Sequence, residues 1–193
     1  MKRAVDCVAA LALLLALAPV LGVAMLAVAC TSPGPMLHRR RVLGRRPFDA
    51  YKLRTMVRDA EVRLINDGQL AAQWDRRAKI AGDPRVTRVG RFLRRWGIDE
   101  LPQLWNVIRG DMSLVGPRFR TEEEWRSWDA AEERIRSVAP GLTGLWQVSG
   151  HHRVAPEERV RLDLEYVARR GFALDLLILL RTPLAVLRME SGL

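Results

Sequence analysis

Cysteine is nearly absent from this sequence. The two cysteines, Cys7 and Cys30, lie at the ends of an N-terminal apolar run, and the rest of the chain contains none. The sequence therefore gives no support for a disulfide framework or for a cysteine-ligated metal site, and it fits a domain kept in the reducing cytosol.

Lysine is also scarce, with 3 residues against 29 Arg. The planar guanidinium of Arg suits phosphate oxygens better than the Lys ammonium does, although a GC-rich genome would produce the same bias. The sequence further lacks internal repeats, low-complexity tracts and the glycine motifs of P-loop and dinucleotide-binding proteins. Any phosphate site must therefore be built in another way.

The chain has 193 residues, of which 49% are hydrophobic, and a formal net charge of +10. This length allows one compact domain plus an appendage, but not two full domains. The positive charge is concentrated from His38 to Arg95, directly after the apolar run. We therefore expect an anionic partner, which could be lipid headgroups, a phosphate substrate or nucleic acid.

The apolar run from Cys7 to Cys30 has 24 residues without a charge, which as a straight helix would cover roughly 36 Å, enough to cross a bilayer core. A cleaved signal peptide is disfavoured, because the basic residues 39–41 follow the run and resist translocation. Pro19 near the middle would bend a helix. Since both flanks are basic, a helix that enters the membrane and returns competes with a spanning helix, and the residues alone leave both open.

The remaining sequence predicts a mostly helical architecture with one small β-hairpin or extended arm at 36–56. A polar, helix-prone stretch follows at 57–80, with an interruption at 66–68. Asp83-Pro84 offers a helix start, and the apolar face that follows, rimmed by Arg, predicts either a helix in the membrane interface or a helix packed on a core. Further predicted elements are a helix at 99–109 with Pro102 in its first turn, an acidic helix at 121–137 with a Thr121–Glu124 capping box, a glycine-rich loop at 140–150, a helix at 156–169 and an apolar interfacial or core helix at 172–188.

Two adjacent carboxylates, Asp99 and Glu100, stand at a predicted helix start, where backbone amides favour anions. One could attack a phosphoryl group and the other could hold Mg²⁺, which bridges carboxylates and substrate phosphates. Taken alone, the pair is better explained by plain N-capping. The loops at 110–118 and 140–150 could bring glycine amides to a phosphate, or could be simple turns.

Four segments in this order and spacing resemble one family, the bacterial sugar transferases that act as monotopic polyprenyl-phosphate phosphoglycosyl transferases. They are YKLRTM at 51–56, DELPQLWNV at 99–107, GDMSLVGPR at 110–118 and PGLTGLWQVSG at 140–150. The resemblance covers nearly the whole chain. It implies a re-entrant N-terminal membrane segment at 1–33 and a catalytic domain at 34–193, on the cytoplasmic face of the bacterial inner membrane.

The resemblance also implies a mechanism. Asp99 would attack a nucleotide diphosphate sugar, most simply a UDP-sugar, and release nucleoside monophosphate, and polyprenyl phosphate would then take the phosphosugar from Asp99. Glu100 would bind Mg²⁺. The matching substrate-binding residues are Lys52, Arg54, Arg94, Arg118 and Asp163. Expected partners are the nucleotide sugar, polyprenyl phosphate and membrane lipid, with no nucleic acid, and a homodimer is left open.

The sequence departs from the family pattern at several positions. Ala18-Pro19 replaces a Ser-Pro pair, and Phe119 replaces the second Pro of a Pro-Arg-Pro motif. His151 stands where the family commonly has an Arg that contacts phosphate, so Arg153 is the candidate replacement. The alternative function is a non-enzymatic basic module that binds membrane or nucleic acid, although nucleic-acid binders favour exposed aromatics beside basic residues.

Overall fold

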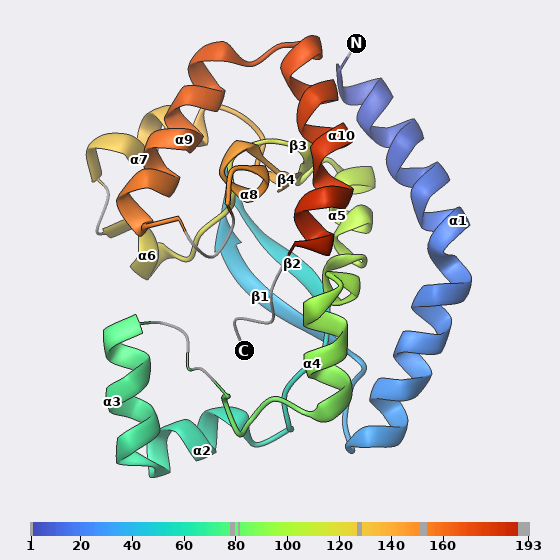
Figure 1. The fold of residues 1–193 in the computed structure, drawn as a ribbon, viewed down its shortest axis with the longest axis vertical. Helices are drawn as coiled ribbons and strands as arrows, with labels where there is room; N and C mark the ends of the chain where they lie inside the picture. Colours follow the sequence, from blue (N-terminus) through green and yellow to red (C-terminus); the bar gives the residue numbers. More distant parts are fainter. Residues whose placement is uncertain (1, 78–79, 81, 127–128, 151–153, 189–193) are drawn as a thin grey trace.

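The computed structural model of the chain describes residues 2–77, 80, 82–126, 129–150 and 154–188. Within these ranges the chain is mostly helical, as predicted (Figure 1). The elements in chain order are α1 (Lys2–Thr31), β1 (Leu37–Leu43), β2 (Pro47–Leu53), α2 (Ala60–Asn66), α3 (Gly68–Arg77), α4 (Arg88–Arg95), the 3-10 turn η1 (Ile98–Glu100), α5 (Gln103–Arg109), β3 (Ser113–Val115), α6 (Glu122–Arg126), α7 (Asp129–Arg136), β4 (Gly141–Thr143), α8 (Leu145–Val148), α9 (Pro156–Arg169) and α10 (Phe172–Leu187).

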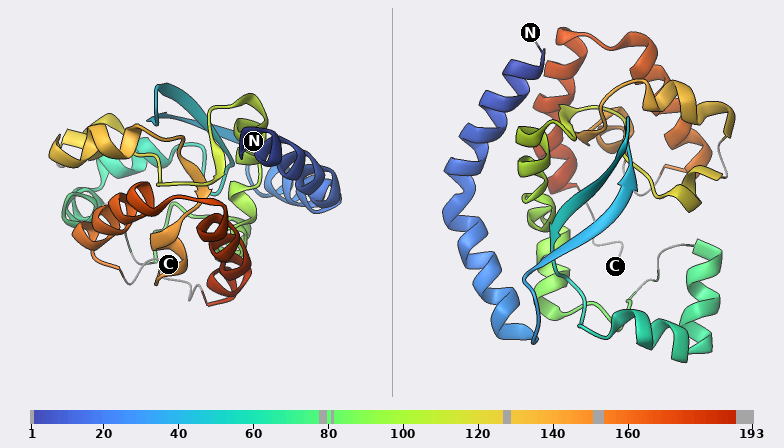
Figure 2. Two further views of the ribbon diagram at one scale, coloured as in Figure 1. Left: turned by 90° about the horizontal axis from the view of Figure 1, so that it is seen from above. Right: turned by 180° about the vertical axis from the view of Figure 1, so that it is seen from behind.

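The N-terminal helix α1 is the longest element and runs unbroken through Pro19. It bows along one side of the molecule, and α4, α5 and α10 lie inside its curve (Figures 1 and 2). Among the described residues it is the one helix long and apolar enough to cross a membrane, and only 11% of its apolar window is buried. Most of its apolar surface is therefore left for another apolar phase to cover.

Polar side chains at the N-terminal end of α1 bind the rest of the protein. Asp6 is buried and accepts a hydrogen bond from Ser113 Oγ at 2.7 Å. Lys2 pairs with Asp175 of α10 at 2.6 Å, and Arg3 donates to two backbone carbonyls at the end of α5.

The C-terminal end of α1 is held in the same way. The Arg54 guanidinium, just after β2, donates to backbone carbonyls in the last turn of α1 and in the segment after it. Ala24 and Val28 of α1 pack with Leu53 and Leu93. Both ends of α1 are therefore attached to one body by polar as well as apolar contacts.

The predicted hairpin is confirmed. Strands β1 and β2 pair antiparallel over their whole length, and the inward side chains of Val42 and Phe48 join the main core with α5. Asn106 of α5 is fully buried; its amide accepts the N–H of Tyr51 at 3.1 Å and donates to the carbonyl of Asp49 at 2.8 Å. Because the side-chain oxygen and nitrogen of Asn106 both bind the backbone of β2, α5 is fixed in register against that strand.

The predicted helix start at Asp83-Pro84 is wrong, since α4 begins at Arg88. The Asp83 carboxylate instead binds its neighbour Arg85 at 2.7 Å in a buried ion pair, and Thr87 caps α4 by accepting the N–H of Gly90 at 2.9 Å. A Cβ on Gly90 would lie 2.0 Å from the carbonyl oxygen of Thr55. The absence of a side chain at Gly90 therefore lets α4 approach the end of β2.

Four other segments differ in detail from the prediction. The expected single helix at 99–109 is split into η1 and α5, with Pro102 as the N-cap of α5. The expected turn at 110–118 contains β3, and the expected loop at 140–150 contains β4, which pairs parallel with β3, and α8. The capping box is confirmed by reciprocal hydrogen bonds between Thr121 and Glu124, although the expected acidic helix is described as two, α6 and α7.

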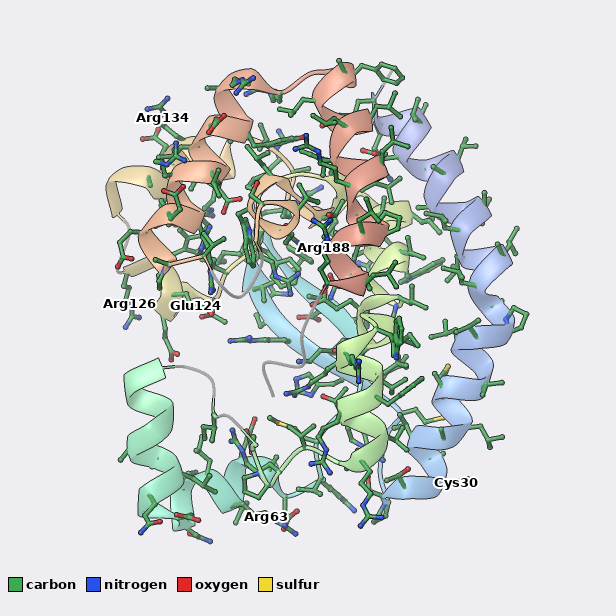
Figure 3. The ribbon with its side chains drawn as sticks, viewed as in Figure 1. Cys30, Arg63, Glu124, Arg126, Arg134 and Arg188 are labelled. Carbon is green, nitrogen blue, oxygen red and sulfur yellow. The ribbon has the colours of Figure 1, made fainter. Side chains whose placement is uncertain are left out.

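Helix α10 follows the predicted boundaries closely. Of its described residues only Ile178 is buried, while much of its leucine-rich surface is exposed. This exposure fits the interfacial interpretation better than a core helix. Figure 3 labels Arg188, which directly follows α10, and Cys30, near the end of α1.

Candidate active site

Asp99 and Glu100 lie in η1, the short turn that links α4 to α5. Gly97, with φ of 64°, adopts the left-handed conformation that lets the chain leave α4 and enter this turn. Asp99 is 7% exposed, whereas the Glu100 side chain is 32% exposed. The two adjacent carboxylates therefore have different surroundings, one protected from water and the other open to it.

Two cations act on the Asp99 carboxylate. Burial raises its pKa to about 6 and the Glu100 carboxylate adds to this rise, while Lys52 from the end of β2 and Arg94 from α4 oppose it. The pKa of the Lys52 ammonium is lowered, first by burial and then by Arg94. The two cations can bind anionic phosphates and so hold them near the nucleophilic oxygen of this largely desolvated carboxylate.

Thr55 fixes the orientation of Arg94. Its hydroxyl accepts the Arg94 Nε–H at 2.8 Å, and Thr55 itself is buried. This hydrogen bond uses Nε, so the two terminal nitrogens of Arg94 are left to donate. Their fork geometry suits two oxygens of a phosphate.

Glu100 and Arg118 form a two-pronged ion pair. The guanidinium of Arg118 donates to both carboxylate oxygens, at 3.0 and 2.6 Å, and lies over the Phe119 ring at 4.8 Å. Arg118 follows β3 and the turn at Gly116-Pro117, so this pair joins the β3 loop to η1. The loop and the two carboxylates therefore belong to one site.

Asp163 binds the segment that follows this loop. It is fully buried in α9 and pairs with Arg120 at 2.7 Å, and Arg120 in turn stacks on Trp125 at 4.8 Å. Burial raises the pKa of Asp163 to about 6, against the effect of Arg120. Asp163 therefore acts on the site through Arg120, two residues after Arg118.

Comparison with known proteins decides the family. The sequence model of the family described as "Bacterial sugar transferase" matches residues 1–189. The chain belongs to this family.

Several relatives of this sugar transferase have descriptive names. It is 44% identical to the UDP-glucose:undecaprenyl-phosphate glucose-1-phosphate transferase of Caulobacter vibrioides, over 99% of this chain and 71% of that protein. It is 39% identical to the exopolysaccharide production protein ExoY of Sinorhizobium fredii, over 96% and 84% of the two chains. It is 40% identical to the UDP-galactose-lipid carrier transferase of Erwinia amylovora, of which it spans 41%.

One predicted site residue of this sugar transferase makes its contacts elsewhere, and another is not among the described residues. Arg54 donates to carbonyls around the end of α1, so it attaches α1 to the segment after β2. Arg153 lies outside the described residues. The other six, Lys52, Arg94, Asp99, Glu100, Arg118 and Asp163, form the site and its support.

Sequence reasoning missed Thr55 and Arg120. Thr55 lies within the YKLRTM segment, yet its role depends on a partner 39 residues away. Arg120 stands two residues after Arg118 and is identified only by its ion pair to α9. The available signal was proximity to motif residues, which does not distinguish a positioning residue from a neighbour.

The acidic pair fits a metal that is shared with substrate. The described residues contain no group of three or more His, Cys, Asp or Glu side chains that could hold a metal ion. Mg²⁺, however, commonly takes one or two carboxylates and completes its shell with substrate phosphates and water. Since Glu100 raises the pKa of Asp99, the carboxylates repel one another, and a cation beside them would relieve that repulsion.

Proposed function

We propose that this chain transfers a phosphosugar from a nucleotide diphosphate sugar, specifically a UDP-sugar, to polyprenyl phosphate and releases nucleoside monophosphate. The names of its relatives support this substrate class, among them the undecaprenyl-phosphate galactose phosphotransferase of Salmonella typhimurium, 37% identical. The product would enter exopolysaccharide, O-antigen or glycoconjugate synthesis. The observation that carries the proposal is the buried carboxylate of Asp99 in the electrostatic field of Lys52 and Arg94.

Asp99 is the proposed nucleophile. One carboxylate oxygen attacks the sugar-bearing phosphorus, the bond from that phosphorus to the nucleoside monophosphate breaks, and the leaving phosphate keeps the electron pair. A phosphate oxygen of polyprenyl phosphate then attacks the same phosphorus and displaces the Asp99 carboxylate. Each step forms one P–O bond and breaks one, so the enzyme returns to its starting state.

The remaining residues bind and position the substrates. Lys52 and Arg94 stabilise the negative charge that moves onto the leaving phosphate, and Thr55 holds Arg94 in place. Glu100, together with the donor phosphates, would hold Mg²⁺, which when bound supplies charge neutralisation at the diphosphate. Arg118 orients Glu100 through its fork and also adds positive charge at the site.

The attachment of α1 bears on its placement in the membrane. Lys2, Arg3 and Asp6 at one end and Arg54 at the other bind the same body. A spanning helix would separate its ends by a hydrocarbon core of roughly 30 Å, with the body on one side only. We therefore propose that α1 enters the membrane and returns, with both ends on the cytoplasmic face of the inner membrane.

The test is release of nucleoside monophosphate from a panel of UDP-sugars by membranes that contain the chain. At least one donor should give release that depends on polyprenyl phosphate. Asp99→Asn should lower this release by on the order of 10³ or more. The matched control is Asp49→Asn on the hairpin, where the carboxylate pairs only with the exposed Arg41 among the described residues.

Two results would contradict the proposal. Release by Asp99→Asn at the wild-type rate would remove Asp99 as nucleophile. Tight binding to anionic vesicles without release from any donor would favour the non-enzymatic basic module instead.

A further inference from the structure

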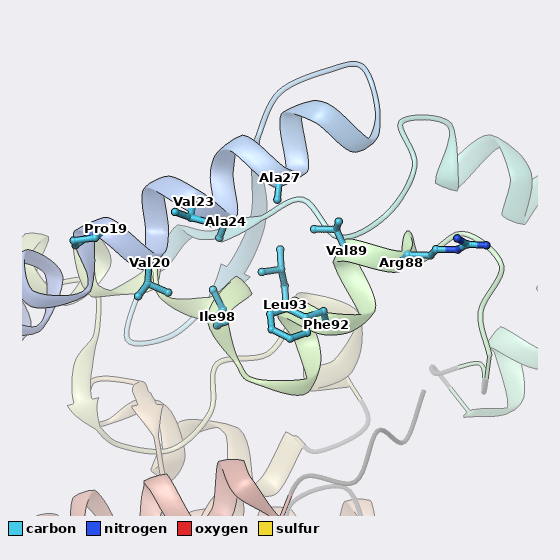
Figure 4. Close-up of a pocket in the computed structure, with 10 residues that line it drawn as sticks. All are labelled: Pro19, Val20, Val23, Ala24, Ala27, Arg88, Val89, Phe92, Leu93 and Ile98. Carbon is cyan, nitrogen blue, oxygen red and sulfur yellow. The ribbon is translucent and has the colours of Figure 1, made fainter.

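An apolar groove of about 620 Å³ runs between the C-terminal half of α1 and α4 (Figure 4). Its α1 wall extends from Pro19 to Ala27 and its other wall from Arg88 to Ile98. The eight-residue step along α1 corresponds to roughly 12 Å. All lining residues except Arg88 are apolar, so the groove suits a short length of hydrocarbon chain.

The groove and the site described above share two elements, η1 and α4. Ile98 lines the groove, and the next residue is Asp99. Neighbouring residues of α4 are divided in the same way between groove and site. Leu93 lines the groove, whereas Arg94 binds Thr55. A molecule in the groove whose polar end extends past Ile98 would bring that end to Asp99 and the cations that act on it.

The groove is open towards the surroundings of α1. Val23 and Phe92, one on each wall, are 69% and 58% exposed, and the neighbouring outer surface of α1 is apolar. The occupant must therefore be apolar along its length, reach the groove from the hydrophobic phase and carry an anionic group at one end. Lys52 and Arg94 provide charge complementarity for such an anion, which in the proposed reaction is a phosphate.

We propose that this groove binds the isoprene units nearest the phosphate of the polyprenyl phosphate acceptor, with the phosphate at the Asp99 site. The inference rests on the proposed function and adds the position of the lipid chain. A single chain fits between two helices, whereas a bulk phospholipid brings two acyl chains to one head group. The groove thus selects the acceptor by its chain and presents its phosphate to the reacting centre.

The first experiment fills the groove. Val23→Trp is compared with Leu26→Trp, which alters an equally exposed residue of α1, 65% exposed, outside the groove. For undecaprenyl phosphate, Val23→Trp should raise KM by about tenfold or more, because the buried isoprene surface is lost. For dimethylallyl phosphate, which has one isoprene unit, the increase should be much smaller, and Leu26→Trp should change neither value beyond about twofold.

The second experiment needs no activity and uses the unaltered chain. A polyprenyl phosphate with a photoreactive diazirine in its second isoprene unit should label the peptides around Val23 and Phe92. Excess undecaprenyl phosphate should prevent labelling, and the same excess of phosphatidylethanolamine should not. This result would support the proposal even if no tested sugar donor supported transfer.

Three outcomes would overturn the inference and leave the proposed function intact. The first is transfer by Val23→Trp with an unchanged KM for undecaprenyl phosphate. The second is labelling that phospholipid prevents equally well, which would make the groove a general lipid site. The third is labelling confined to the exposed surface of α10. If the wild type showed no transfer but was labelled around Val23 and Phe92 as expected, only the proposed function would be contradicted.

Discussion

Replacing Asp99 with Asn should stabilise the folded protein while it removes transfer. The folded state raises the pKa of this carboxyl from 3.8 to about 6, and each unit corresponds to ~1.36 kcal/mol. The ionised carboxylate therefore costs the fold about 3 kcal/mol at neutral pH. This value already includes the attraction of Lys52 and Arg94, which reduces the pKa shift without cancelling it.

The sign of the effect gives it a pH signature. Because the folded-state pKa lies above the unfolded value, the favourable contribution of the protonated group is complete below pH 3.8. It is lost as the pH rises and stays lost above about 6. Asn carries no charge at any pH, so Asp99→Asn should gain stability at pH 7.5 and little at pH 4.

Thermal unfolding of wild type and variant, in one detergent and at both pH values, measures this difference. A gain of ~3 kcal/mol corresponds to a rise in Tm of about 6–12 °C at this chain length, and it is an upper value because Asn also loses solvation. Asp49→Asn, at a half-exposed position, should shift the free energy of unfolding by less than ~0.5 kcal/mol. If Asp99→Asn lowered the free energy of unfolding by the same amount at pH 4 and at pH 7.5, the Asp99 carboxylate would not be desolvated.

Three other predictions concern activity and placement. Transfer measured as kcat/KM should fall as the pH drops through about 6, because protonation removes the Asp99 nucleophile; a flat profile from about pH 5 to 8 would refute this. Chelation of divalent cations should abolish turnover, and added Mg²⁺ should restore it. Glu100→Gln should require more Mg²⁺ for the same activity. Full activity in excess chelator would show that Glu100 does not bind a metal. Lys2→Cys and Arg40→Cys, each in a background without Cys7 and the exposed Cys30 (Figure 3), should both resist a membrane-impermeant label in intact cells, and labelling at position 2 alone would indicate a spanning helix.

Local signals predicted the elements that depend on local contacts. The hairpin follows from the alternation and breaks at 36–56, and α9 follows from Pro156 at its first position. The Thr121–Glu124 capping box needs only residues three apart, and both of its hydrogen bonds are present. Each of these features is complete within a few residues of sequence, which is why sequence reasoning reached it.

The helix start before α4 shows the limit of such signals. Asp83, Pro84 and Thr87 are all acceptable at a helix N-terminus, and the choice between them is tertiary. Asp83 is taken by Arg85, and the close approach of Gly90 to Thr55 fixes where α4 begins. Neither contact can be read from periodicity.

Sequence reasoning also reached only part of the candidate site. Asp99, Glu100, Lys52, Arg94 and Arg118 were predicted by resemblance to a family, and the structure brings them together. Arg54 was placed with them, yet its partners are backbone carbonyls 21 to 26 residues away. Backbone carbonyls carry no sequence signature, so an anchoring Arg and a substrate-binding Arg look alike in the sequence.

The most direct test of the central claim is the mass of the peptide that contains Asp99. Wild-type protein given only the competent nucleotide sugar should carry one phosphosugar on that peptide, and the adduct should disappear when polyprenyl phosphate is added, as a ping-pong reaction requires. Asp99→Asn should carry none. An active preparation in which the adduct never forms on Asp99, or forms on another residue, would contradict the mechanism even with family membership unchanged.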